Sequence, residues 1–243
     1  MARIFITGSA DGLGQLAAKA LIAQGHQVVL HARSEKRGKE ALEKAPGAET
    51  VVTADLNSID ETIQLSEKVN ALGKFDAVIH NAAVYHASSK ELFAVNTLAP
   101  YILTCLIHKP KRLIYLSSGM HKGGRVDVDS MKNNISSVTY SDTKLHVFLL
   151  CKAVARKWTE VYANAVDPGW VPTKMGGKGA PGDLKKGYET QVWLAVSNDE
   201  KAKVSGRFFY HQEEIRYNPV ADDVQLQERF MTVCNELTGI SFL

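Results

Sequence analysis

The first fourteen residues decide the fold: they are Met1-Ala-Arg-Ile-Phe-Ile-Thr-Gly8-Ser-Ala-Asp-Gly12-Leu-Gly14. The apolar run Ile4 to Ile6 predicts a short strand covered on both faces, as in the middle of a parallel sheet. From Leu13 onward, apolar residues recur at helical spacing as far as Gly25, where the helix is expected to end. The stretch therefore predicts a strand, a glycine-rich turn and a helix in direct succession.

Such a turn can bind an anion. The first turn of the helix presents unpaired N–H groups and the positive end of the helix dipole, and glycines without Cβ atoms let a pyrophosphate approach the backbone. Three nearby glycines can also form an ordinary turn. The strand before them and the helix after them favour nucleotide binding over that alternative.

Length and composition bound the class of protein. With 243 residues, of which 45% are hydrophobic and 23% charged, the chain is expected to form one soluble domain over residues 1–243. The formal net charge of +3 is too small to indicate a nucleic-acid partner. No apolar tract is long enough to span a bilayer, and the first strand begins too early to leave room for a signal or transit peptide.

The three cysteines, Cys105, Cys151 and Cys234, lie in apolar helical stretches without short spacing. An odd and scattered set predicts reduced thiols in the core and a cytoplasmic location. His86 and His121 also lack a metal-binding companion at short spacing, so no metal site is expected and each is interpreted as a surface or structural histidine.

Strand and helix patterns alternate along the rest of the chain. Strands are expected at 26–31, 50–53, 75–80, 112–116, 162–166 and 207–211, and helices at 34–45, 58–73, from 88 onward, 138–158, 191–197 and 221–237. Capping-box patterns begin the helices at Ser58 and Ser88. The alternation predicts right-handed βαβ units and therefore an α/β fold, a single-domain Rossmann-type doubly wound parallel sheet with helices on both faces. The glycine-rich stretch 174–187 predicts a mobile loop, so a flexible substrate loop is expected at about 172–190.

The end of the second strand bears on the choice of cofactor. NAD-binding units commonly carry an acidic residue there, which accepts hydrogen bonds from the ribose 2′-hydroxyl. This chain has His31-Ala-Arg33 instead, without a carboxylate. Arg33 offers a planar fork suited to a 2′-phosphate, and Ser34 could add to the site, although cations here could also merely solvate the next helix. The sequence therefore favours NADP(H), with NAD(H) as the alternative.

Tyr140 and Lys144 lie four residues apart at the start of an apolar helix, so both side chains project from one face. A nearby ammonium group stabilises the phenolate form and is expected to lower the pKa of Tyr140 toward the range useful for proton transfer. By itself, such a pair is also common in amphipathic helices that have no catalytic role.

Seven short motifs occur in a fixed order: Thr7-Gly-Ser-Ala-Asp-Gly-Leu-Gly14, Asp55-Leu56, Asn81-Ala-Ala83, Asn96, Ser117-Ser118, Tyr140-Ser-Asp-Thr-Lys144 and Asp167-Pro-Gly169. Each is weak alone. The ordered set, over nearly the whole chain, resembles the classical short-chain dehydrogenase/reductase (SDR) family. The longer segment 119–139 and the C-terminal run 205–230 look most like the retinol-dehydrogenase-like branch, although branch membership does not fix the substrate.

The resemblance implies four catalytic residues. Tyr140 would protonate the carbonyl oxygen during reduction and act as the base in the reverse direction. Lys144 would lower the pKa of Tyr140 and hold the nicotinamide ribose, and Ser118 would donate a hydrogen bond to the substrate oxygen. Asn96 would hold a water molecule that links Lys144 to solvent. Asp167 is given no catalytic role.

The resemblance also implies the cofactor contacts. Asp55 would accept a hydrogen bond from the adenine amino group, Asn81 would lie near the adenosine ribose, and Val171 and Thr173 would fix the nicotinamide carboxamide. Asp11 is a departure, because some NADP-dependent members carry a basic residue there. The expected cofactor-binding residues are Thr7, Gly8, Ser9, Asp11, Gly12, Leu13, Gly14, Arg33, Ser34, Asp55, Leu56, Asn81, Ala82, Tyr140, Lys144, Pro168, Gly169, Val171 and Thr173.

The expected function is that of an NADP(H)-dependent oxidoreductase, a carbonyl reductase or alcohol dehydrogenase that acts on a small and apolar carbonyl or hydroxyl compound. Trp170, Met175 and Trp193 could form an apolar wall for that substrate or belong to the core. One alternative is a non-catalytic NADP-binding regulator, which would be expected to lose members of the Ser, Tyr, Lys set. The other is a nucleotide-sugar epimerase or dehydratase of the extended relatives, which needs a longer C-terminal region. The resemblance allows a homodimer or a homotetramer.

Overall fold

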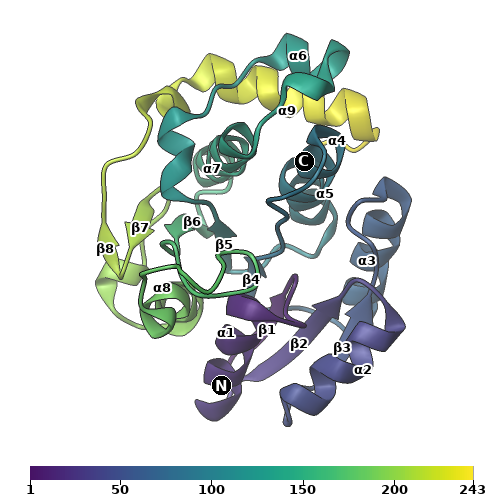
Figure 1. The fold of residues 1–243 in the computed structure, drawn as a ribbon, viewed down its shortest axis with the longest axis vertical. Coiled ribbons are helices and arrows are strands. Elements are labelled where there is room, and N and C mark those ends of the chain that lie inside the picture. Colours follow the sequence, from purple (N-terminus) through teal and green to yellow (C-terminus); the bar gives the residue numbers. More distant parts are fainter. Residues whose placement is uncertain (243) are drawn as a thin grey trace.

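The computed structural model describes residues 1–242, which form an eight-stranded sheet between two layers of helices (Figure 1). The strands lie in the order β3-β2-β1-β4-β5-β6-β7-β8, and every neighbouring pair is parallel except β7 and β8. The predicted doubly wound parallel sheet is confirmed. The strands are β1 (Arg3–Ile6), β2 (Gln27–Ala32), β3 (Thr50–Thr53), β4 (Ala77–His80), β5 (Arg112–Leu116), β6 (Tyr162–Asp167), β7 (Phe208–Tyr210) and β8 (Glu213–Glu214).

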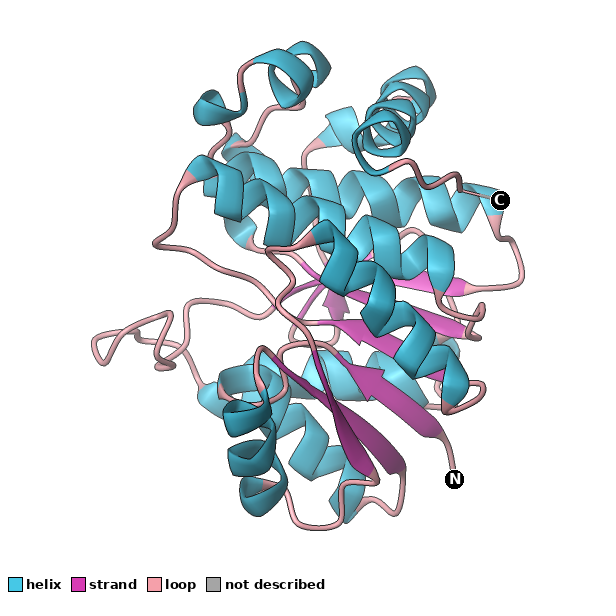
Figure 2. Cartoon of the chain, turned by 90° about the vertical axis from the view of Figure 1, so that its right-hand side faces the viewer, coloured by secondary structure: helices cyan, strands magenta, loops and turns pink. Residues whose placement is uncertain are grey.

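Helices cover both faces because alternate strand residues point to opposite sides of the sheet. Phe5 and Val29 belong to the core beneath α3, α5 and α7, whereas Ile4 and Val28 belong to the core beneath α1, α2 and α8. Figure 2 shows the strands between these helices. The helices are α1 (Gly12–Ala23), α2 (Glu35–Lys44), α3 (Ile59–Ala71), α4 (Ser89–Phe93), α5 (Ala99–Leu106), α6 (Val128–Asn133), α7 (Tyr140–Lys157), α8 (Leu184–Val196) and α9 (Val224–Thr238).

The order of the strands creates a switch point between β1 and β4. From β1 the chain winds outward through β2 and β3, and from β4 it winds the other way through β5 and β6. In open α/β sheets, ligands bind at such a point, outside the carboxyl ends of the strands. Within residues 1–242, no helix is both long and apolar enough to cross a membrane.

The helix after the glycine-rich loop is longer than predicted. It begins at Leu184 rather than near residue 191, so the predicted loop 174–187 extends too far. The Asp183 side chain caps it by accepting hydrogen bonds from the backbone N–H groups of Lys185 and Lys186. Gly187 looked like a loop residue, but it lies inside the helix, where a Cβ would stand only 3.2 Å from a Leu13 methyl group. The glycine allows α8 to approach α1 closely.

The predicted helix starts at Ser58 and Ser88 are confirmed, but neither serine is part of a complete capping box. Both serine hydroxyls accept from the backbone N–H three residues later. The Glu61 carboxylate, however, accepts from the N–H of Asp55 instead of from that of Ser58. It therefore fixes the loop that follows β3, beside the switch point.

Several regions have structure that the periodicity did not predict, among them the short antiparallel strand β8. The helix expected from residue 88 is interrupted by a π-helical turn at Ala94–Leu98, between α4 and α5. The segment 119–139 contains a 3₁₀ turn at Gly119–Gly123, the short helix α6 and a second 3₁₀ turn at Ile135–Ser137.

Candidate active site

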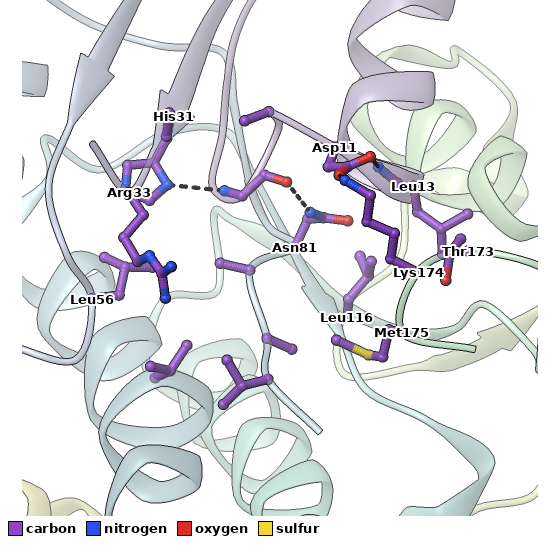
Figure 3. Close-up of a pocket in the computed structure, with 18 of the residues that line it drawn as sticks. Asp11, Leu13, His31, Arg33, Leu56, Asn81, Leu116, Thr173, Lys174 and Met175 are labelled. Carbon is purple, nitrogen blue, oxygen red and sulfur yellow. Dashed lines mark hydrogen bonds and ion pairs between the residues drawn. The ribbon is translucent and has the colours of Figure 1, made fainter. Parts of the chain in front are cut away.

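A cavity of about 400 Å³ opens at the switch point (Figure 3). Its walls come from the glycine-rich turn, the end of β2, the loops after β3, β4 and β6, the end of β5, and the start of α7. The predicted site residues that line it are Gly8, Asp11, Gly12, Leu13, Arg33, Asp55, Leu56, Asn81, Ala82, Tyr140, Lys144, Pro168 and Thr173.

The other predicted cofactor residues do not line the cavity. Thr7 and Ser9 are buried, and the Thr7 hydroxyl accepts hydrogen bonds from the N–H groups of Asn81 and Ala82. Ser34 caps α2, and Val171 is buried. The set of residues outside the cavity lining is Thr7, Ser9, Gly14, Ser34, Gly169 and Val171.

Two glycines of the turn are required by close backbone approach. Gly8 has φ +64°, and a Cβ on it would stand 2.8 Å from the Cα of Ala82. A Cβ on Gly14 would stand 2.4 Å from Nδ2 of Asn81. The Asn81 amide needs that space, since it donates hydrogen bonds to the carbonyls of Thr7 and Gly8 at 2.9 and 3.1 Å. The loop after β4 thus braces the turn after β1.

His31 is a second brace of the turn, and the sequence patterns missed it. Its Nδ1 accepts a hydrogen bond from the N–H of Gly8 at 3.0 Å, so Nε2 carries the proton and donates to the carbonyl of Ala54 at 3.1 Å. Burial lowers the pKa of His31 to about 4, against the opposing hydrogen bond to Ala54. A histidine at the end of the second strand, next to a glycine-rich turn, was the only available signal.

The free energy of unfolding should therefore depend on pH through His31. The folded protein keeps this imidazole neutral down to about pH 4, whereas the unfolded chain binds a proton near pH 6.5. The contribution of His31 to stability is fully present above pH 6.5 and should fall by about 3 kcal/mol as the pH drops to 4. Chemical denaturation between pH 4 and 7 measures this slope. His80 and His146 contribute to the same slope, because burial lowers their pKa values as well. His31→Asn should therefore reduce the slope without abolishing it, and His108→Asn, at an exposed position, should leave it unchanged; an equal slope in all three proteins would contradict the assignment.

The two arginines near the adenosine end of the predicted site differ in their partners. Arg37 donates to Glu40 at 2.9 Å and to Asp11 at 3.3 Å. Arg33 is exposed and lines the cavity, and within residues 1–242 it has no hydrogen bond or ion pair. The Asp55 carboxylate accepts from the N–H of Asn57. The free guanidinium beside the cavity is therefore that of Arg33.

Tyr140 and Lys144 are held together by the start of α7 and the end of β5. Thr139 caps the helix in a complete capping box with Asp142, which places Tyr140 at its first residue. The buried ammonium group of Lys144 donates to the carbonyl of Leu116 at 2.8 Å and lies 5.4 Å from the centroid of the Tyr140 ring. Ser117 donates to the carbonyl of Lys144 at 2.7 Å.

Ser118 does not line the cavity, but its hydroxyl forms a hydrogen bond with Tyr140. It also caps the following 3₁₀ turn by accepting from the N–H of Met120. Behind it, the buried His121 donates from Nδ1 to the Ser118 carbonyl at 2.6 Å, because its Nε2 accepts from the N–H of Asn218. The interpretation of His121 as a structural histidine is confirmed, and it positions Ser118.

The pKa of Tyr140 differs from the expectation. Burial raises this pKa above its usual value, the neighbouring Tyr85 and Asp167 add to the effect, and the hydrogen bond with Ser118 opposes it. Burial also lowers the pKa of Lys144 to about 8, while Asp167 acts to raise it. The expected lowering of the Tyr140 pKa by Lys144 is therefore wrong for this structure, in which the ammonium group is directed to a backbone carbonyl.

Asn96 lies in the π-helical turn, and its side-chain amide forms hydrogen bonds with other protein groups. Its Nδ2 donates to the carbonyl of Val84 at 2.9 Å and to the hydroxyl of Thr143 at 3.1 Å, and its Oδ1 accepts from the N–H of Val84. Both amide donors are therefore used within the protein. Asn96 joins the loop after β4 to α7, one residue before Lys144.

The remaining candidates separate into surface and core. Met175 lines the cavity and is 40% exposed, and Trp170 is 63% exposed on the loop after β6. Trp193 packs against Phe209 in the core. His86 is exposed against the ring of Tyr85. Among the described residues, no group of three or more His, Cys, Asp or Glu side chains could hold a metal ion.

Known proteins are similar to this chain in sequence and in fold. Residues 2–182 match the family model described as short chain dehydrogenase. An uncharacterized oxidoreductase of Emericella nidulans is 47% identical over 253 residues, which cover 99% of this chain and 98% of that protein. Retinol dehydrogenase 13 of Mus musculus is 26% identical over 283 residues, which cover 98% of this chain and 84% of that protein. A crystal structure of an uncharacterized protein from Mycobacterium Paratuberculosis has a TM-score of 0.85 at 20% identity, covering 100% of this chain and 95% of that one.

The family model covers most of the chain, and the fungal relative matches almost its full length. The chain therefore belongs to the short-chain dehydrogenase family of NAD(P)-dependent oxidoreductases.

Proposed function

We propose that the protein is an NADP(H)-dependent carbonyl reductase, or alcohol dehydrogenase in the reverse direction, with Tyr140 as its acid and base. One observation carries this proposal. The Tyr140 hydroxyl is hydrogen-bonded to Ser118 and lies beside the buried ammonium group of Lys144, at a cavity that begins at the N-terminus of α1. This is a proton donor next to a site suited to a dinucleotide.

The residues of the cavity fit such a cofactor. Gly12 and Leu13 line it in the first turn of α1, where N–H groups have no carbonyl partner within the helix and favour an anion such as pyrophosphate. Arg33 would hold a 2′-phosphate, while Asp55, Leu56 and Asn81 would lie along the adenosine half. Pro168 and Thr173 would border the nicotinamide half, which supplies the hydride when the cofactor is bound.

Tyr140 is suited to give a proton to a carbonyl oxygen. Because burial raises its pKa, the phenol keeps its proton at neutral pH and can serve as the acid of a reduction. Ser118 would donate a hydrogen bond to the same oxygen and stabilise the charge that develops there. Lys144, whose pKa of about 8 leaves it mostly charged at pH 7, would add positive charge beneath the phenol.

The substrate is proposed to be a small, mainly apolar carbonyl compound. Met175 and Val95 line the cavity, and the loop that carries Met175 continues to the exposed Trp170. Residues 172–190 were expected to form a flexible substrate loop within a single catalytic domain. That role is retained for residues 172–182, before α8 begins.

Turnover with NADPH tests the function directly. The purified protein should oxidise NADPH, followed by its absorbance at 340 nm, when supplied with members of a panel of aldehydes, ketones and quinones. Apolar carbonyl compounds should give the highest kcat/KM. Tight NADPH binding without turnover over the whole panel and the corresponding alcohols would contradict the proposal and favour a non-catalytic NADP-binding protein.

A further inference from the structure

The loop after β6 is a compact unit, which we call the flap, residues 170–182. Its N–H and carbonyl groups bond to one another, with Gly182 donating to the carbonyl of Trp170 at 2.9 Å and Gly177 to that of Thr173 at 2.8 Å. The indole N–H of Trp170 also bonds within the flap, donating to the carbonyl of Gly176 at 2.8 Å. A loop bonded in this way is expected to move as one piece.

Val171 packs beside Gly187 of α8, and one ion pair is the polar contact that joins the flap to the rest of the protein. The ammonium group of Lys174 donates to Oδ2 of Asp11, at the start of α1. Among the residues that the structure describes, this is the only hydrogen bond or ion pair between the flap and the remaining chain. Lys174 and Asp11 both line the cavity, so their contact joins its two walls.

Asp11 carries a negative charge where a dinucleotide would place its phosphates. Its Oδ1 accepts from the N–H of Gly12 at 2.9 Å, so the carboxylate adjoins the anion-binding turn. Burial acts to raise the pKa of Asp11, but hydrogen bonds from Lys174, from Gly12 and from Arg37 hold it below its usual value. An unpaired carboxylate here would repel a phosphate. Lys174 and Arg37 compensate this charge.

Lys174 keeps donors free for a ligand. Its side chain is 78% exposed, and Asp11 is its only ion-pair partner within residues 1–242. An ammonium group has three N–H donors, so it can bond Asp11 and a phosphate oxygen together. Figure 3 places Lys174 and Asp11 on one side of the cavity, near Leu13, and Arg33 on the other. The two cations therefore serve different parts of one ligand.

We propose that Lys174 is a cofactor-binding residue that neutralises Asp11 and presents an ammonium group to the pyrophosphate, so that the flap and the bound dinucleotide hold each other in place. This rests on the proposed function only in that a dinucleotide occupies the cavity. In this proposal Lys174, a flap residue, strengthens the binding of the phosphates, whereas the negative charge of Asp11 weakens it. Loss of Lys174 should speed cofactor release as well as weaken binding.

Two single variants and their combination test the proposal, because they should act in opposite directions. Lys174→Met leaves Asp11 less well compensated, and should raise the Kd of both NADPH and NADH about fivefold, a size typical of a partly exposed charge interaction. Asp11→Asn keeps a good helix cap and frees two cations, so it should lower both Kd values. The double variant should lie near the wild type. Fluorescence titration gives Kd, and stopped-flow displacement gives the release rate.

The controls separate this proposal from simpler ones. Lys178→Met removes an exposed cation of the flap that lies outside the cavity lining and should change neither Kd. If the pair is only a structural tie, Asp11→Asn and Lys174→Met should weaken binding alike, and the proposal is overturned. A loss confined to NADPH would assign Lys174 to the 2′-phosphate and also overturn it. Failure of the wild type to bind either nucleotide would instead refute the proposed function.

Discussion

Tyr140→Phe should lower kcat for carbonyl reduction by about 10²- to 10⁴-fold, the usual contribution of a positioned general acid. The change removes one hydroxyl group and keeps the ring, which packs edge-on against Tyr85 with centroids 4.6 Å apart. The substrate oxygen would then lose its proton donor, and Ser118 would lose its hydrogen-bond partner. Steady-state kinetics with NADPH and the best carbonyl compound of the panel would measure the effect.

The matched control is Tyr85→Phe, which removes a hydroxyl from the neighbouring ring. Tyr85 packs on Tyr140 but does not line the cavity, so its kcat should stay within a few-fold of the wild-type value. The Kd of NADPH should be unchanged in Tyr85→Phe and should stay within a few-fold of the wild-type value in Tyr140→Phe, which would show that each variant is folded and binds the cofactor. Full carbonyl-reducing activity in Tyr140→Phe would disprove the proposed proton transfer.

The fold could be predicted because its signals are local. The run Ile4 to Ile6, the glycines after it and the helical spacing from Leu13 lie within one short stretch, and β1 and α1 follow them. The serines at positions 58 and 88 correctly predicted the starts of two helices. The start of α8 was missed because Gly187 suggests a loop, whereas its lack of a side chain serves helix packing.

Parts of the site could be predicted where a local motif identifies the residues. Parts that depend on contacts between residues distant in the sequence could not. Tyr140 and Lys144 share a helix, so their spacing indicated their proximity. The partners of Asn96 and the bond from His31 to Gly8 arise from tertiary folding. The Tyr140 pKa was predicted in the wrong direction because the sequence shows a nearby ammonium group but not the burial of the phenol.

The ion pair between Asp11 and Lys174 is the contact of the candidate site that the sequence could predict least. The two residues are 163 positions apart, and no short motif links them. From the sequence, Asp11 is only an acid at a place where a base would suit NADP. In the structure, two cations from α2 and from the flap surround it. The positive charge expected at that position is supplied from elsewhere in the chain.

Arg33→Ala should raise the Kd of NADPH about tenfold or more and leave that of NADH within about twofold. A charge-assisted hydrogen bond to phosphate is stronger than a neutral one, and a planar guanidinium can form two at once. Arg33 has no competing partner within the described residues, so its donors are available. Arg37 should not replace it fully, because Asp11 and Glu40 already bind that guanidinium.

Lys36→Ala is the matched control, since Lys36 is an exposed cation three residues further on that does not line the cavity. It should change neither Kd, which would separate a specific phosphate contact from the general positive field of α2. Arg33→Lys should give an intermediate loss for NADPH, because an ammonium group keeps the charge without the fork. Both affinities would be measured at several salt concentrations, and the NADPH-specific part should shrink as salt rises. Equal losses of NADPH and NADH in Arg33→Ala would mean that Arg33 contacts a part common to both cofactors, and the preference for NADP(H) would then have to be abandoned.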